Sequence, residues 1–101
     1  MHKLTYLPLA KKDLKNIIDY ISDTLKAPNA AIDFVDELES SIVRLQQFPY
    51  SCKVYPSIEP IDTEYRMLPV KNYLVFYVVT EHVVEIHRII YARMNLDKLL
   101  R

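Results

Sequence analysis

The chain has 101 residues, of which 50% are hydrophobic and 26% charged, an ordinary composition for a single folded domain spanning residues 1–101. Thirteen Lys and Arg residues balance thirteen Asp and Glu residues. No global basic field therefore attracts nucleic acid, and we expect no direct DNA binding by the chain alone. No apolar run approaches the roughly 20 residues that span a bilayer, so we expect a cytoplasmic protein without a membrane partner.

Several kinds of site are excluded by residues that are missing or isolated. The chain has no glycine, which excludes the Gly-rich loops that cradle phosphate groups. Cys52 is the only cysteine, and the three histidines are scattered, so no zinc-ligand spacing exists. A lone cysteine also fits a reducing compartment. We expect no metal and no cofactor.

The first half of the chain predicts one strand and a pair of helices. Residues 2–7 favour a short strand, and Pro8 suits the first turn of the helix that follows. From 10 to 26, and again from about 28 to 47, apolar residues recur at offsets of three and four, which is the period of an amphipathic helix. Because Pro28 makes so short a break, the two helices are expected to form an antiparallel hairpin.

The second half predicts a small sheet. Three prolines indicate an irregular connection at 49–63, after which strands are expected at about 64–70, 73–80 and 83–91. The strand at 73–80 is apolar on both faces, so it should be central and covered on both sides. A short helix at 95–101 could end the chain.

These elements predict an α+β fold. It comprises an N-terminal strand, an α-helical hairpin and a three-stranded antiparallel meander, with the helices packed on one face of the sheet. The opposite face would be available for a functional cleft or for a partner.

Arg88 stands out because it interrupts an apolar strand. Its position in the strand places it with three apolar residues, Val84, Ile86 and Ile90. A buried arginine must be paired and hydrogen-bonded. We interpret Arg88 as a structural residue that pairs with Asp13 or Asp19 of the first helix. The alternative is a catalytic or phosphate-binding arginine.

Polar residues late in the last strand form a second candidate set. His87 is expected to share a face with Glu85, Ile89, Tyr91 and, continuing the strand, Arg93. A His, a Tyr and an Arg on one face could provide acid–base and oxyanion chemistry for a phosphodiester. An exposed polar strand face would have the same pattern. Arg66 and Lys71, which flank the central strand, could add positive charge at the same end.

Six segments match one family pattern in order and in spacing. They are LPLAKKDLKNIIDYI at 7–21, A-x-x-F-x-x-x-L at 31–38, L-x-x-F-P at 45–49, YRML at 65–68, NYLVFY at 72–77 and IHRIIYARMN at 86–95. Together they resemble the RelE/ParE superfamily of toxins from type II toxin–antitoxin modules over nearly the whole chain. The fold that this resemblance implies, a helical hairpin against a small antiparallel sheet, agrees with the one predicted from periodicity.

The resemblance implies one of two activities. RelE-like members are ribosome-dependent mRNA endonucleases, whereas ParE-like members inhibit DNA gyrase and lack the RNase residues. Where the RelE-like branch has an arginine in the central strand, this sequence has Leu74. It offers a basic residue, Arg66, on the preceding strand and an acceptable Tyr91 late in the last one. The ending at 86–95 is similar to the ParE-type I-x-R-I-L-H-x-R-x-D, with Tyr91 and Asn95 as departures.

We therefore expect a ParE-like toxin that inhibits growth through DNA gyrase when it is free of its antitoxin, without enzymatic chemistry. The zero net charge favours the same branch, because phosphate contacts supply most of the affinity for RNA. The alternative is RelE-like cleavage of mRNA on the ribosome. In that case Arg66, Arg93 and Lys71 would stabilise the phosphate, and Tyr91 or His87 would transfer the proton.

A second alternative is a non-toxic, degenerate module that only binds an antitoxin. In all three cases the resemblance implies a cognate antitoxin as partner, wrapping the toxin with an extended segment that folds on binding. None of the three implies a metal.

Overall fold

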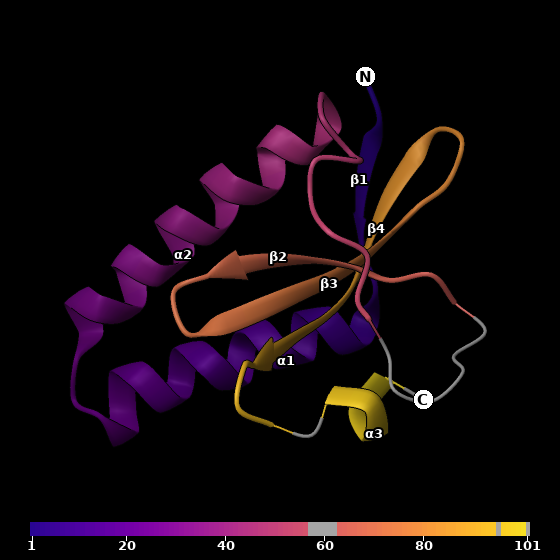
Figure 1. Cartoon of the computed structure of the whole chain (residues 1–101). Helices are drawn as coiled ribbons and strands as arrows, with labels where there is room; N and C mark the ends of the chain where they lie inside the picture. Colours follow the sequence, from indigo (N-terminus) through magenta and orange to yellow (C-terminus); the bar gives the residue numbers. More distant parts are fainter. Residues whose placement is uncertain (57–62, 95, 101) are drawn as a thin grey trace.

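The computed structural model describes residues 1–56, 63–94 and 96–100. Its elements run in the order β1 (Lys3–Tyr6), α1 (Pro8–Asp19), η1 (Tyr20–Thr24), α2 (Pro28–Val43), η2 (Arg44–Gln46), β2 (Arg66–Val70), β3 (Tyr73–Val79), β4 (Val83–Tyr91) and α3 (Leu96–Leu100) (Figure 1). Within these described residues, no helix has the length and apolar character needed to cross a membrane. Positions 57–62 of the expected connection, and 95 and 101 of the expected last helix, lie outside the described residues.

The four strands form one mixed sheet in the order β1-β4-β3-β2. Strands β2, β3 and β4 make the predicted antiparallel meander. Strand β1 instead pairs in parallel with β4, from Lys3 opposite Val83 to Tyr6 opposite Ile86. Parallel neighbours need a crossover connection, and the hairpin of α1 and α2 lies within it. This arrangement places β3 and β4 inside the sheet, so the fold confirms the predicted α+β class.

Both helices of the hairpin begin at a proline. Pro8 and Pro28 lie in the first helical turns, where a missing N–H costs nothing. Helix α1 widens into the π-helical turn η1, and the chain then reverses at Lys26, which has a φ of 52°. Lys71, in the β2–β3 turn, has the same φ. Because the chain has no glycine, lysine occupies both left-handed positions at a steric cost that glycine would avoid.

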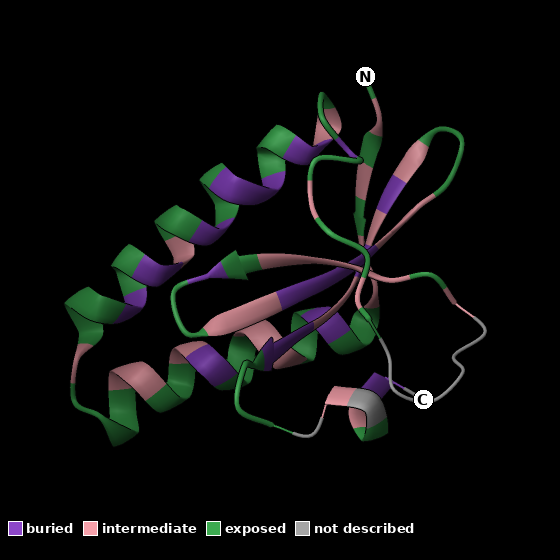
Figure 2. Ribbon diagram, in the orientation of Figure 1, coloured by how far each residue is buried: buried purple, intermediate pink, exposed green. Residues whose placement is uncertain are grey.

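The main core lies between the helical hairpin and one face of the sheet. Helix α2 contributes a buried stripe, which Figure 2 shows as purple positions repeated along the helix, whereas α1 buries Ala10 and Ile17. The sheet contributes Val75 and Tyr77 of β3 together with three residues of β4. The buried members of this core are Ala10, Ile17, Phe34, Leu38, Ile42, Leu45, Val70, Val75, Tyr77, Val84, Ile86 and Ile89.

The opposite face of the sheet carries a second, smaller core. Phe76 and Ile90 are buried there with Leu100 of α3. Partly buried side chains surround them, namely Tyr55, Tyr65, Met67, Leu74, Leu96 and Leu99. Strand β3 is therefore covered on both sides, as predicted. The expectation that this face would be available was wrong over this area, because α3 and the segment before β2 cover it.

A β-bulge interrupts the pairing of β3 with β4. Phe76 lies opposite Arg88, but the next residue, Tyr77, lies opposite Ile86. His87 is thus an extra residue in β4, with no partner of its own in the β3 register. An extra residue reverses the alternation of side chains beyond it.

The reversal corrects the predicted faces of β4. The residues of β4 that reach the main core are Val84, Ile86 and Ile89, whereas Ile90 reaches the second core. Ile90 therefore does not share the face of Val84 and Ile86, as had been expected. Ile89 packs in the main core, whereas His87 contacts Tyr65, which packs on the second. The predicted grouping of His87 with Ile89 was wrong because no sequence period reveals the bulge.

Replacement of Tyr77 by Phe tests the polar contact inside the main core. The fully buried Tyr77 hydroxyl donates to the Pro49 carbonyl oxygen at 2.9 Å. In Tyr77→Phe that carbonyl loses its donor, so the free energy of unfolding in urea should fall by about 1–2 kcal/mol.

The same variant should change how stability depends on pH. Burial raises the pKa of Tyr77 above its ordinary value of 10.0. The folded state then holds the phenolic proton more tightly than the unfolded chain, so this stability is complete below pH 10 and is lost as the pH rises further. Unfolding followed against pH should show a smaller alkaline loss in Tyr77→Phe. Equal losses in the two proteins would contradict this assignment.

Candidate functional site

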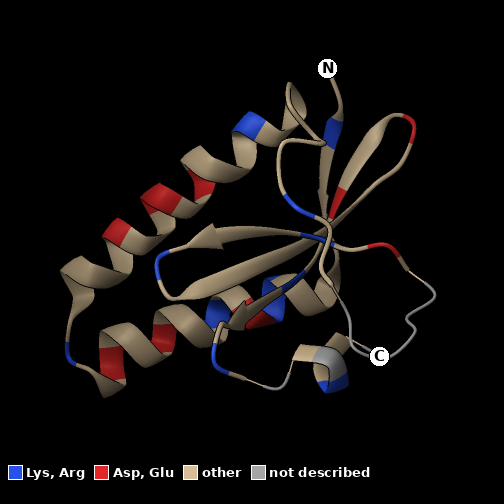
Figure 3. Cartoon of the chain, viewed as in Figure 1, with Lys and Arg blue, Asp and Glu red and all other residues tan. Residues whose placement is uncertain are grey.

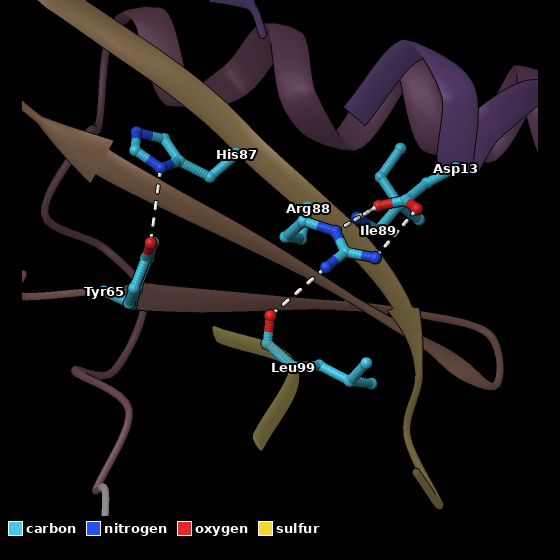
Figure 4. Close-up of polar contacts among 6 residues, drawn as sticks. All are labelled: Asp13, Tyr65, His87, Arg88, Ile89 and Leu99. Atoms are coloured by element: carbon cyan, nitrogen blue, oxygen red, sulfur yellow. Dashed lines mark hydrogen bonds and ion pairs between the residues drawn. The ribbon is translucent and has the colours of Figure 1, made fainter. Parts of the chain in front are cut away.

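Arg88 forms a bidentate ion pair with Asp13. Its Nε donates to Asp13 Oδ2 at 2.8 Å, and its Nη2 donates to Oδ1 at 3.0 Å (Figure 4). The two side chains are only 19% and 12% exposed. The hydrogen bond with Asp13 raises the pKa of Arg88 above its already high ordinary value. Of the two carboxylates that the sequence suggested as partners of Arg88, Asp13 is the one in contact. Asp19 pairs instead with Lys15 at 2.8 Å.

This Asp13–Arg88 clamp joins three elements. Asp13 Oδ2 also accepts the backbone N–H of Ile89 at 3.0 Å, immediately beyond the bulge in β4. Arg88 Nη1 donates to the Leu99 carbonyl oxygen of α3 at 3.2 Å. The clamp therefore fixes α1, the end of β4 and α3 relative to one another.

His87 lies between two polar side chains on the second-core side of the sheet. Its Nδ1 is 3.4 Å from the Tyr65 hydroxyl, and its Nε2 is 3.2 Å from Glu85 Oε1. The Tyr65 and His87 rings meet edge-on with centroids 5.3 Å apart. A hydroxyl, an imidazole and a carboxylate in sequence can pass a proton. This Tyr65–His87–Glu85 relay is one arrangement among the described residues that acid–base chemistry could use.

Arg66 belongs to the other face of β2. Its neighbours Tyr65 and Met67 pack on the second core, so its own side chain points the opposite way. There its Nη1 donates to the Cys52 carbonyl oxygen at 2.7 Å, and its guanidinium lies 5.0 Å from the centre of the Tyr50 ring. The Arg66 side chain is only 19% exposed. It holds the segment before β2 against the sheet.

Lys71 and Tyr91 line a cleft where the β2–β3 turn meets the helical hairpin. The cleft has a volume of about 580 Å³. The Tyr73 ring centre lies 5.1 Å from that of Phe34 and 5.6 Å from that of Tyr91. Lys71 Nζ pairs with Glu37 of α2 at 3.2 Å. We call this opening the aromatic cleft, and its lining residues are Tyr20, Ile21, Leu25, Ala30, Phe34, Lys71, Asn72, Tyr73 and Tyr91.

The aromatic cleft adjoins a smaller pocket that leads to the clamp. This pocket, of about 300 Å³, shares Tyr20, Tyr73 and Tyr91 with the cleft and is also lined by Asp13 and Arg88. Partial burial raises the pKa of the Tyr73 hydroxyl above its ordinary value, with smaller contributions from the neighbouring tyrosines. The Tyr73 hydroxyl therefore stays protonated at neutral pH and acts as a neutral hydrogen-bonding group.

The predicted site residues do not converge. Arg66 lies opposite Tyr77 in the sheet, whereas Tyr91 lies opposite Tyr73, four residues and about 13 Å away along β3. His87 is on the other face from Arg66, and Arg93 is exposed in the turn after β4. Lys71 and Tyr91 are the pair that share one opening. Within the described ranges, no three His, Cys, Asp or Glu side chains are grouped as metal ligands.

Sequence reasoning missed most of the aromatic cleft. Tyr20, Phe34 and Tyr73 come from three segments whose proximity follows only from the fold. A signal was present at Tyr20, the first residue of η1, because it is a large aromatic ring outside the apolar stripe and is 49% exposed. Tyr65 packs on the second core, and its hydroxyl also contacts His87, which no sequence spacing predicted.

Nearly the whole chain matches the model of a known protein family. The model described as the ParE toxin of the type II toxin–antitoxin system, parDE, matches residues 4–96. The chain belongs to the ParE toxin family. The match confirms the resemblance found in the sequence, including its ParE-like branch. The chain is therefore the toxin of a type II toxin–antitoxin system.

Several solved structures have a fold similar to that of this ParE-family toxin. The chromosomal ParDE toxin–antitoxin system from P. aeruginosa matches with a TM-score of 0.74 and 24% identity, covering 92% of this chain and 98% of that one. The E. coli DinJ–YafQ complex matches with a TM-score of 0.62 and 14% identity, covering 90% and 93%. At these identities the likeness concerns the fold alone. No curated protein matches the sequence significantly.

Replacement of Arg88 by Ala should destabilise this toxin rather than remove its activity selectively. Without the guanidinium, the largely buried Asp13 carboxylate keeps only the Ile89 N–H as a donor, so we expect a loss of about 3 kcal/mol in the free energy of unfolding in urea. Lys15→Ala, which breaks the exposed pair with Asp19 on the same helix, is the matched control and should change stability little. A stable Arg88→Ala protein that no longer arrests growth would refute the structural assignment.

Proposed function

We propose that this ParE-family toxin arrests growth by binding DNA gyrase, without catalysing a reaction of its own. The observation that carries the proposal is how its cationic and acid–base residues are used. Arg88 is bound to Asp13, and Arg66 is bound to the Cys52 carbonyl oxygen on the opposite face of the sheet from His87. Lys71 does share the aromatic cleft with Tyr91, but its ammonium group is paired with Glu37. A nuclease site needs a phosphate-binding group and a proton-transfer group around one phosphodiester.

Leu74 supports the same proposal. It occupies the position where the resemblance to the RelE-like branch implies an arginine, and its side chain packs on the second core with Phe76 and Ile90. Its partner across the sheet is Ile90. The environment is thus apolar and suits leucine, and an arginine there would need a partner that the described neighbours do not provide.

The aromatic cleft offers a surface for a protein target. Tyr20 and Tyr91 are 49% and 40% exposed around a floor that includes the buried Phe34. Tyrosine is enriched at protein interfaces because a rigid ring gives apolar contact while its hydroxyl stays hydrogen-bonded. We assign the gyrase contact to this cleft.

A cognate antitoxin completes the proposal. The fold neighbours belong to a ParDE toxin–antitoxin system and to a complex of YafQ with DinJ, which supports an antitoxin as the partner of this chain too. By occupying apolar surface on the toxin, the antitoxin would keep it from its target.

Cleavage of mRNA on the ribosome is the second candidate. The Tyr65–His87–Glu85 relay favours it, since an imidazole between a hydroxyl and a carboxylate can act as an acid or a base. The relay would then be the proton-transfer group, and its loss would abolish cleavage.

Induced expression without antitoxin separates these possibilities. We expect growth arrest, with filamentous cells, a DNA-damage response and no new mRNA 5′ ends. His87→Ala and Tyr65→Phe should arrest growth as the unmodified toxin does, because neither residue lines the aromatic cleft. Tyr20→Ala should weaken the arrest at least tenfold in the inducer concentration required.

Other outcomes would favour other functions. New mRNA ends that disappear in His87→Ala would identify an endonuclease and refute the gyrase proposal. Full expression without any arrest would indicate a non-toxic antitoxin-binding module.

A further inference from the structure

The walls of the aromatic cleft are aromatic rings that are inclined to one another rather than stacked. The plane of the Tyr73 ring meets that of Phe34 at 57° and that of Tyr91 at 69°. Tyr20, the first residue of η1, adds a fourth ring to the lining. The face of an aromatic ring carries the negative part of its quadrupole, so several rings around one opening attract a cation.

The three tyrosine hydroxyls of the cleft lie close to one another. After burial, the nearness of Tyr20 and of Tyr91 is what raises the pKa of Tyr73, because one phenolate would repel the next. Within the described part of the chain, none of the three hydroxyls forms a hydrogen bond with another residue. Their oxygens can therefore accept hydrogen bonds from a ligand that carries several N–H donors.

The charges beside the cleft favour a cation over an anion. Lys71 is the one lining residue with a full charge, and its ammonium group is already paired with Glu37 at 3.2 Å. Glu37 and Asp33 lie one turn apart on the side of α2 that supplies Ala30 to the lining. Asp33 forms no ion pair with any described residue, and Figure 3 shows red acidic positions along this helix. An anion would therefore meet an uncompensated carboxylate.

We propose that the aromatic cleft encloses an arginine side chain presented by gyrase. The proposal rests on the proposed function, since it names the group that the gyrase contact inserts. A guanidinium is a planar cation that stacks on aromatic faces, and its five N–H donors suit the hydroxyl oxygens of Tyr20, Tyr73 and Tyr91. A lysine ammonium brings fewer donors and is more strongly hydrated. An apolar side chain would leave the hydroxyls unpaired.

Substitutions at Tyr91 distinguish a cation site from an apolar one, with affinity for purified gyrase measured by surface plasmon resonance. Tyr91→Phe keeps the ring face and is the reference. Relative to it, Tyr91→Leu keeps apolar bulk without a ring and should bind gyrase about tenfold more weakly. Phenylalanines with more ring fluorines at this position should bind progressively more weakly, because fluorine withdraws negative charge from the ring face while nearly preserving its shape.

A pair of charge reversals tests the cation independently. Asp33→Lys should lower the affinity for gyrase about fivefold, because it places a positive charge beside the inserted guanidinium. Glu81→Lys is the matched control, since Glu81 is 88% exposed in the β3–β4 turn, outside the cleft lining, and the change in net charge is the same. It should keep the affinity of the unmodified toxin. Unfolding in urea shows whether each variant is folded.

Three outcomes would overturn the proposal. Equal affinities of the Phe, Leu and fluorinated variants, while Tyr20→Ala still weakens binding, would show that apolar contact suffices and would leave the proposed function intact. Tighter binding by Asp33→Lys than by the unmodified toxin would identify an anionic group as the occupant. An unmodified toxin that does not bind gyrase would refute the proposed function and this proposal with it.

Discussion

The bidentate ion pair between Asp13 and Arg88 is the interaction on which the arrangement of this toxin most depends. It spans 75 residues of sequence and satisfies the Ile89 N–H that follows the β-bulge. A bulge at this point would otherwise leave the end of β4 poorly held, because the extra residue disturbs the regular ladder. By fixing that end against α1, the clamp positions Tyr91 two residues further on, and with it one wall of the aromatic cleft.

The two arginines of the sheet, Arg66 and Arg88, thus have structural roles. Arg88 secures α1 and α3, and Arg66 secures the segment before β2. Outward, the toxin presents the aromatic cleft, whose lining includes three tyrosines. Surfaces of this kind suit contacts with other proteins, as the proposed function requires.

Much of this fold could be predicted from the sequence, because local periodicity locates each helix and strand and the cost of burying Arg88 demands a carboxylate partner. What failed depended on long-range events. The bulge at His87 leaves no trace in composition, yet it moves Ile89 to the face of Val84 and Ile86 and moves Ile90 away from that face. A short last helix was expected, but α3 is five residues long and has too few turns for its sequence to show which face packs on the sheet. The aromatic cleft unites segments that only the folded sheet brings together.

The most direct measurement is DNA supercoiling by purified gyrase in the presence of the purified toxin. If the toxin acts by binding gyrase, supercoiling should fall as toxin is added and recover when the antitoxin is supplied. His87→Ala should inhibit as strongly as the unmodified toxin, because the relay has no part in this contact. Undisturbed supercoiling, together with cleavage of ribosome-bound mRNA by the same preparation, would contradict a toxin that acts without chemistry.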